Sequence, residues 1–285
     1  MKLERGTILL VLVGTLFLFN IFIFYSLALS QRGKLSVSFL DIGQGDAIFI
    51  EAPNGNQMII DGGRGKVVLS QLSAVMPFFD RSIDVVLATH PDADHIAGLI
   101  DVFPRYDISL FLESGVLHET GITESLERVA EEEEGLVRVL ARSGMRIHLG
   151  GGALLDILFP DRDVSGMESN MGSIVARLSY GETSVMLTGD SPIAIEEYLV
   201  SHFGGALHST ILKLGHHGSK TSSALSFISA VSPDVAVISA GKDNSYGHPH
   251  QEVLDRIATV GISSVSTIDL GMIQFVSDGR VFRRR

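Results

Sequence analysis

The sequence has no cysteine among its 285 residues. Disulfide bonds and thiolate metal sites are therefore excluded. Any metal ion that the chain binds must be held by imidazole and carboxylate groups. Ten histidines and 33 acidic residues are available for that purpose.

Basic residues are also scarce. There are 22 lysines and arginines against 33 acidic residues, a formal net charge of −11. A passive nucleic-acid binder needs a basic face for phosphate contacts, so this balance disfavours one. Bound divalent cations would offset part of the charge locally, so a nucleic-acid function is weakened but not excluded. With 45% hydrophobic and 19% charged residues, the composition is typical of a packed globular protein.

Residues 7–29 form one apolar run without a charged residue. A helix of this length can cross a hydrocarbon core of about 30 Å. The alternatives are a buried core helix and a signal peptide cleaved near Ala28-Leu29-Ser30. Because the run is longer than a usual signal-peptide core, we expect an uncleaved transmembrane anchor within residues 1–33.

The flanks of this run scarcely decide its orientation, since Lys2 and Arg5 precede it while Arg32 and Lys34 follow it. Insertion as a signal-anchor would place residues 34–285 outside the cytoplasm, on a single-pass protein of the cell membrane. Cleavage would make the same domain a secreted protein.

Residues 34–285 contain no Pro/Ser-rich linker and no short tandem repeat, so we expect one domain. Alternating or short apolar runs predict strands at residues 35–40, 47–52, 58–60, 84–88, 108–112, 154–159, 173–178, 184–187, 211–214 and 235–239, with two more at the C-terminus. Helical spacing predicts helices at residues 67–79, 123–141, 193–203, 223–231 and 251–260. Strands in runs, with helices between the runs, in two similar halves favour an α/β fold with two facing sheets and helices outside.

The strongest chemical signal follows the strand expected at residues 84–88. It reads Thr89-His90-Pro91-Asp92-Ala93-Asp94-His95 and holds four potential metal ligands within six residues. Loops at the carboxyl ends of strands are where α/β folds place their sites. Nitrogen and oxygen ligands of this kind suit zinc, manganese or iron. The alternative is a polar loop that only caps the helix beginning near Asp94.

The pattern His-x-Asp-x-Asp-His resembles the metal signature of the metallo-β-lactamase superfamily, with aspartate in the second ligand place. Three other segments match in order: Ile59-Ile60-Asp61-Gly62-Gly63, Leu187-Thr188-Gly189-Asp190 and Leu214-Gly215-His216-His217-Gly218-Ser219. The resemblance implies a four-layer αββα sandwich, here preceded by the N-terminal helix, and a hydrolase that uses two divalent ions, zinc or manganese.

Within that superfamily the chain is similar to the soluble C-terminal domain of ComEC-type DNA-uptake competence proteins. The segments that carry this similarity are Phe39-Leu40-Asp41-Ile42-Gly43-Gln44-Gly45-Asp46-Ala47, His216-His217-Gly218-Ser219 and Tyr246-Gly247-His248-Pro249. The similarity covers nearly all of residues 35–285. The multi-helix channel of those proteins has no counterpart in this sequence, so the chain by itself cannot form a DNA-conducting pore.

The resemblance also implies roles for individual residues. The metal ligands would be His90, Asp92, Asp94, His95, Asp190 and His216. His90 and Asp92 would hold the first ion, with Asp190 bridging to a second ion held by Asp94, His95 and His216. Asp46 and Asp61 would orient imidazole N–H groups. Two such ions lower the pKa of a water molecule enough for hydroxide to be available near neutral pH.

The superfamily's middle histidine has no clear counterpart here. His118 and His148 fall in the right interval but lack a recognisable context, so Asn170 or Ser173 is expected to face the metals. His217 and Ser219 are expected to shape the pocket. His248 is expected to act in catalysis, with Asp94, as a proton donor or transition-state ligand; the alternative is that it caps the helix after Pro249.

These residues favour a phosphodiesterase or nuclease that acts at the membrane surface and is linked to DNA uptake. The expected partners are DNA or another phosphodiester, and the membrane through the N-terminal helix. The first alternative is a hydrolase of another ester or amide, such as a phosphocholine ester, a lactone or a β-lactam. The second is a catalytically silent scaffold that binds metal or DNA.

Overall fold

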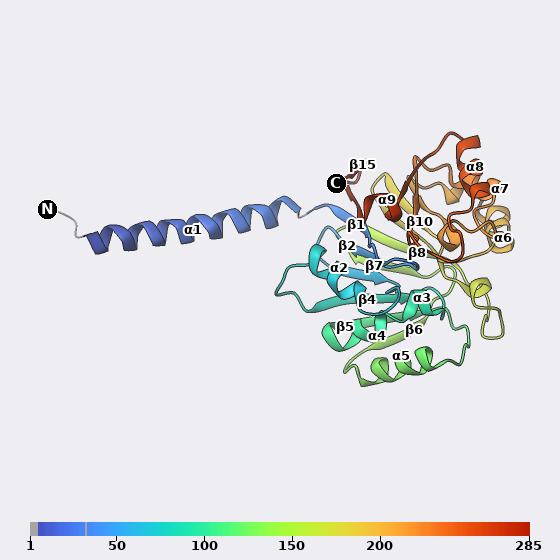
Figure 1. The fold of residues 1–285 in the computed structure, drawn as a ribbon, viewed down its shortest axis with the longest axis horizontal. Coiled ribbons are helices and arrows are strands. Elements are labelled where there is room, and N and C mark those ends of the chain that lie inside the picture. Colours follow the sequence, from blue (N-terminus) through green and yellow to red (C-terminus); the bar gives the residue numbers. More distant parts are fainter. Residues whose placement is uncertain (1–4, 32) are drawn as a thin grey trace.

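The computed structural model describes residues 5–31 and 33–285. Its helices are α1 Arg5–Gln31, α2 Val67–Val75, α3 Ala93–Ile96, α4 Leu99–Val102, α5 Gly121–Glu132, α6 Ile193–Phe203, α7 Leu225–Val231, α8 Gln251–Thr259 and α9 Thr267–Leu270. Figure 1 shows α1 extending away from the remainder of the chain.

Two sheets make up the centre of the fold. The first has the strand order β15-β14-β1-β2-β3-β4-β5-β6 and the second β13-β12-β11-β10-β9-β8-β7. The first sheet consists of β1 Leu35–Phe39, β2 Ile48–Glu51, β3 Gln57–Ile60, β4 Ser82–Ala88, β5 Asp107–Glu113, β6 Val137–Leu140, β14 Ile273–Ser277 and β15 Phe282–Arg284. The second consists of β7 Arg146–Gly150, β8 Ala153–Phe159, β9 Val175–Tyr180, β10 Thr183–Leu187, β11 Ile211–Lys213, β12 Val235–Ile238 and β13 Ser263–Ser266.

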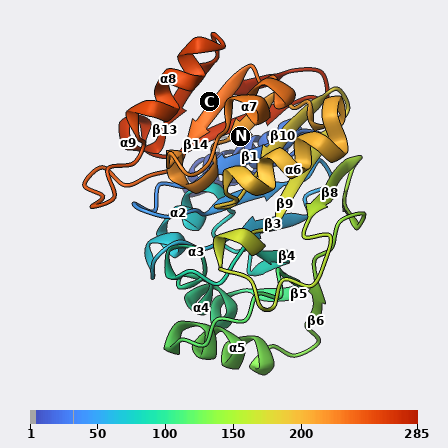
Figure 2. The same cartoon turned by 90° about the vertical axis from the view of Figure 1, so that its right-hand side faces the viewer.

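Side-chain alternation along the strands builds three separate cores. In β4, Val85 and Leu87 point into the core between the two sheets, while Val86 and Ala88 point into the core beneath α2–α5. A third core lies between the second sheet and α6–α8. Figure 2 shows these two helix groups on opposite sides of the sheets. The predicted αββα sandwich is therefore confirmed.

The N-terminal segment gives a different result. Residues 7–29 lie in α1, and the described side chains from 9 to 23 are exposed. Over the residues and side chains that the structure describes, no helix is both long and apolar enough to cross a membrane. The predicted transmembrane helix is therefore not supported.

The predicted helix at residues 123–141 is wrong in its second half. α5 ends at Glu132, and Gly135 then takes a left-handed φ of +82°, which a helix does not tolerate. The chain continues as β6, whose β-branched Val137 and Val139 suit a strand paired in parallel with β5.

Two further regions were predicted incompletely. β7 was missed; it pairs with β8 through a turn in which Gly150, Gly151 and Gly152 all have positive φ. Three strands rather than two follow α8, because β13 extends the second sheet in parallel with β12 before β14 and β15 return to the first.

Candidate metal centre

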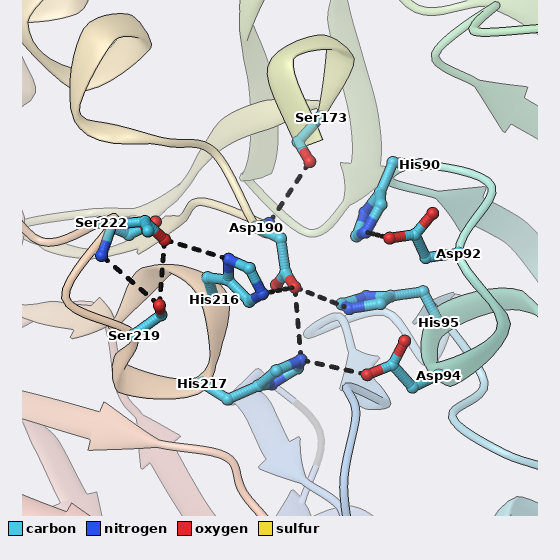
Figure 3. Close-up of polar contacts among 12 residues, drawn as sticks. His90, Asp92, Asp94, His95, Ser173, Asp190, His216, His217, Ser219 and Ser222 are labelled. Atoms are coloured by element: carbon cyan, nitrogen blue, oxygen red, sulfur yellow. Dashed lines mark hydrogen bonds and ion pairs between the residues drawn. The ribbon is translucent and has the colours of Figure 1, made fainter. Parts of the chain in front are cut away.

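The polar residues of the motifs meet at one edge of the two sheets. The loop after β4 carries His90–His95, the loop after β10 carries Asp190, and the loop after β11 carries His216 and His217. Figure 3 shows these side chains turned toward one another, with the Asp190 carboxylate in the middle. The carboxyl ends of β4, β10 and β11 therefore supply most of the site, as the strand-end rule for α/β folds predicts.

Asp61 fixes the orientation of two histidines. It is 1% exposed and accepts hydrogen bonds from Thr89 N at 2.8 Å and Thr89 Oγ1 at 2.7 Å. Its Oδ2 also lies 2.8 Å from His95 Nδ1. Because the Thr89 hydroxyl donates to Asp61, its oxygen is left to accept from His90 Nδ1 at 2.9 Å. Both imidazoles thus have Nδ1 occupied and Nε2 directed into the site.

Asp190 is the point on which the histidines converge. Its Oδ2 lies 3.3 Å from His95 Nε2, 3.3 Å from His217 Nε2 and 3.6 Å from His216 Nε2. Its backbone N–H donates to Ser173 Oγ at 3.3 Å, so Ser173 holds the loop that carries Asp190. Asp190 is 3% exposed. A buried carboxylate surrounded by imidazoles from two different loops can bridge two cations.

The remaining candidate ligands divide between the two sides of Asp190. His90 Nε2 lies 3.6 Å from Asp92 Oδ2 on one side. On the other side His217 Nε2 lies 3.6 Å from Asp94 Oδ2. The loop motif therefore supplies one aspartate to each side, paired with His90 on one side and with His217 of the loop after β11 on the other, and Figure 3 shows this separation.

The pair of histidines after β11 is arranged differently from the expectation. Both have left-handed backbones, with φ of 49° for His216 and 55° for His217, an uncommon conformation for two consecutive non-glycine residues. The predicted partner of Asp94 was His216, but the ring beside Asp94 belongs to His217. His217 is 1% exposed, and its Nδ1 lies 3.0 Å from the Ser239 carbonyl oxygen, so its Nε2 too is directed at Asp190.

A second buried carboxylate, that of Glu196, anchors the loop that follows these histidines. Glu196 of α6 accepts backbone hydrogen bonds from Ser223 and Ala224, each at 2.7 Å. Burial raises the pKa of Glu196 to about 7. Glu196, which is 1% exposed, therefore ties the loop that follows His217 to α6.

The charges of the site depend on one another. Burial alone would raise the pKa of Asp190, but His217 and His95 hold it well below its usual range. Burial alone would lower the pKa of His95, but Asp190 and Asp61 raise it well above the usual value. The pKa of Asp94 falls to about 2 because His217 and His95 outweigh its burial. Metal binding to these imidazoles must therefore displace protons.

The donor set fits divalent cations. Among the described residues, the buried atoms of the site without a hydrogen-bond partner include His90 Nε2, His95 Nε2, His217 Nε2, Asp190 Oδ1 and Asp46 Oδ1. Unsatisfied buried polar atoms are costly unless an ion or water completes them. One tight group has ligand atoms that all lie within 4.8 Å of one another: Asp46, His95, Asp190 and His217. Imidazole with carboxylate is a combination typical of zinc, manganese and iron sites.

Lys213 occupies part of that tight group. Its side chain is 0% exposed, its Nζ forms an ion pair with Asp46 Oδ2, and it donates to the Gly189 carbonyl at 3.3 Å. The same Nζ lies 3.9 Å from Asp190 Oδ1. Asp46, expected to orient an imidazole, lies 3.4 Å from His217 Nδ1 but is neutralised mainly by this lysine.

The entry motif that supplies Asp46 requires glycine at Gly45. Its φ is +123°, and a Cβ there would overlap the backbone carbonyl oxygen of Asp94. Asp46 N donates to that same carbonyl at 3.2 Å, and Ser239 Oγ donates to the Gly45 carbonyl at 3.0 Å. The motif therefore packs backbone to backbone against the metal-signature loop.

His248 lies beside the histidine pair. Its ring centroid is 5.4 Å from that of His216 and 5.7 Å from that of Tyr246. Asn244 binds the backbone of His248 at both N and O, at 2.9 and 2.7 Å. Burial, with His216 and His217 nearby, lowers the pKa of His248 to about 4, so its imidazole is neutral at pH 7.

The other expected pocket residues lie at the margin. Asn170 opens a short 3-10 turn, Asn170–Gly172, and its Oδ1 is a further buried atom without a hydrogen-bond partner within the described chain. Ser219 bonds to Thr221 Oγ1 at 2.9 Å and stabilises the histidine loop.

Two residues of the site were not assigned to it from the sequence. Lys213 is the last residue of the apolar strand β11. A lysine at the end of an apolar strand was the sequence signal that could have identified it. His118 lies in the loop after β5 with its Nδ1 3.8 Å from Asp92 Oδ1. That loop has no periodicity, so only the fold brings His118 to the metal centre.

Comparison with known proteins agrees with this geometry. The model of the metallo-beta-lactamase superfamily matches residues 40–242, so the chain belongs to that superfamily. The chain is 31% identical over 271 residues to ComE operon protein 3 of Bacillus subtilis (strain 168), a match that covers 89% of this chain. It is 30% identical over 258 residues to competence protein ComA of Neisseria gonorrhoeae, again over 89% of this chain. Each match covers 34% of the relative, so the chain spans about a third of the length of these relatives.

A solved structure supports the fold. Igni18, a metallo hydrolase from Ignicoccus hospitalis, aligns with a TM-score of 0.53 over 84% of this chain and 98% of its own, at 17% identity. Fold, family and a candidate metal site thus agree on a metallo-β-lactamase-type protein with competence-protein relatives.

Replacing Lys213 tests its role as an internal counter-ion. Lys213→Met should lower the free energy of unfolding of the metal-free chain by about 3–5 kcal/mol, because it leaves the buried Asp46 carboxylate uncompensated. Urea denaturation followed by circular dichroism measures this loss. Lys220→Met, at an exposed lysine of the loop that follows β11, is the matched control and should have little effect.

A double variant separates the charge from the packing. Lys213→Met with Asp46→Asn removes both buried charges, so it should recover much of the stability lost in the single variant. A single variant as stable as the unmodified chain would contradict the counter-ion role.

Proposed function

We propose that this chain is a two-metal phosphodiesterase, with single-stranded DNA among its substrates. The observation that carries the proposal is the Asp190 carboxylate, which is surrounded by unsatisfied imidazole nitrogens and has one histidine–aspartate pair on each side. A bridging carboxylate between two cation sites is typical of enzymes that hydrolyse phosphate esters. The names of the relatives, which are competence proteins, support DNA as the substrate.

The ligands divide between two ions in the following way. We infer that His90 and Asp92, with His216, would hold one ion, and that Asp94, His95 and His217 would hold the other. His217 therefore takes the place that His216 had in the sequence interpretation. Zinc and manganese both suit this set. When bound, two such ions supply an activated water and Lewis-acid stabilisation of the transferred group.

The chain's own residues orient the candidate ligands and donate hydrogen bonds. Asp61 holds the imidazoles of His90 and His95 with Nε2 toward the reacting group. His248, neutral at pH 7, presents an imidazole next to His216 from a loop fixed by Asn244. From this position its remaining N–H can donate a hydrogen bond to charge that develops on a phosphoryl or leaving oxygen.

Metal-dependent hydrolysis tests the proposal directly. The chain loaded with Mn²⁺ or Zn²⁺ should cleave single-stranded DNA and bis(p-nitrophenyl) phosphate, and EDTA should abolish both activities until metal is restored. A lactone and a β-lactam in the same assay test the alternative hydrolases. Stoichiometric metal binding without turnover of any substrate would instead favour a silent scaffold.

Two substitutions separate metal binding from stabilisation of the transition state. Asp190→Asn should lose metal and activity together, because it removes a charge that holds two cations close. His248→Ala should retain metal and lower kcat by about 10²–10³-fold, the range for loss of one hydrogen-bond donor to the transition state. Metal analysis with single-turnover kinetics measures both effects.

The exposed His202 of α6 offers a matched control, since His202→Ala should change neither metal content nor kcat. Loss of a metal ion from His248→Ala would make His248 a ligand. Unchanged turnover in His248→Ala would show that His248 has no catalytic role and only precedes α8.

Action at a membrane surface is a second part of the proposal. It is supported by the exposed apolar side chains of α1, among them Leu16 at 60% and Phe17 at 65% exposure. Leu16→Asp with Phe17→Asp should shift the full chain from the membrane fraction to the soluble fraction of a cell lysate. Phe78→Asp with Phe79→Asp, at residues 89% and 85% exposed outside α1, is the control. An equal distribution of both variants would argue against membrane action.

A further inference from the structure

A cavity of about 410 Å³ lies directly beside the candidate metal centre. His90 and Pro91 form its border with the metal-signature loop. The loop after β5, the first turns of α5 and the edge strand β6 form the other walls. His118 belongs to the cavity lining and also approaches Asp92, so a molecule in this space reaches the metal centre.

Much of the lining is apolar, and some of its apolar side chains are exposed to solvent. Leu117 is 75% exposed and Leu140 is 50% exposed, whereas Leu126 beneath them is buried. Leucines gathered at the mouth of a cavity next to a polar site are typical of contact with the organic part of a ligand.

The charged groups of the lining exclude a phosphate from this space. Four carboxylates face one guanidinium: Glu113, Glu119, Glu124 and Glu127 against Arg138. Arg138 is already paired, donating to Glu113 at 2.8 Å and to Glu127 at 2.7 Å. Glu119 and Glu124 are exposed. Carboxylates of this kind repel anions and accept hydrogen bonds from N–H groups.

We propose that this cavity binds a nucleobase of the substrate while the adjoining phosphodiester lies at the metal centre; the inference rests on the proposed function. The leucine side chains pack against the face of the ring, as apolar side chains do around extruded bases. The carboxylates accept from exocyclic amino and ring N–H groups, as aspartate and glutamate do from cytosine N4. A paired base cannot enter without leaving its duplex, so the cavity selects single strands or frayed ends.

Binding of uncharged nucleosides tests the cavity without any metal chemistry. Cytidine and guanosine should bind the metal-free full chain, as measured by calorimetry or ligand-observed NMR. Leu117→Asp should weaken binding by about tenfold or more, because the ring would have to desolvate a new carboxylate. Phe79→Asp, an equally drastic change at a residue 85% exposed outside the cavity lining, should leave binding unchanged.

Two matched double variants, on and near α5, test the carboxylates of the cavity. Glu119→Gln with Glu124→Gln should weaken cytidine binding by about tenfold, the effect of losing a hydrogen bond to a charged group. Glu131→Gln with Glu132→Gln makes the same change in charge at exposed residues of α5 outside the lining and should have no effect. Equal losses in both pairs, or no nucleoside binding by the unmodified chain, would overturn the inference.

The two proposals fail separately. Metal-dependent cleavage of phosphodiesters by a chain that binds no nucleoside overturns the base cavity and leaves the phosphodiesterase intact. Nucleoside binding that responds to the cavity variants, in a chain that cleaves no phosphodiester with either metal, overturns the phosphodiesterase and leaves a base-binding site.

Discussion

The carboxylate of Asp61 is the interaction on which the geometry of the metal centre depends. It joins the end of β3 to the loop after β4 by accepting both the backbone and side-chain hydrogen bonds of Thr89. Through the same two oxygens it sets the ring of His95 directly and that of His90 by way of the Thr89 hydroxyl. Its own backbone is left-handed, with φ of 57°, which turns the side chain under the loop. The buried Asp61 carboxylate thus links the end of β3 to the orientation of the imidazoles of His90 and His95.

The fold and the position of the site could be predicted from local patterns. An apolar strand followed by four ligand-type residues places those residues at a sheet edge whatever the details of packing. Asp190 and the histidine pair were identified by family resemblance, and each of them also follows a short apolar strand. The superfamily match confirms the resemblance.

Roles that depend on backbone torsion or on the far side of the fold could not be predicted. His216 and His217 are adjacent, and which ring meets Asp94 is decided by two unusual φ values that the sequence does not announce. His118 reaches Asp92 from an irregular loop of another strand. The helix expected over residues 123–141 failed at a single glycine, because the apolar spacing on either side of Gly135 is compatible with both a helix and a strand.

The buried ammonium group of Lys213 has a consequence for how the protein matures. It supplies a positive charge to a pocket that also gathers the buried carboxylates of Asp46 and Asp190. Zinc-finger domains lack such a group and stay unfolded until their ion arrives. Here the polypeptide carries its own substitute for part of the ionic charge, so the sandwich can close before any metal is present. Folding and metallation then become successive events, and the occupancy of the centre can follow the supply of ions after synthesis is complete.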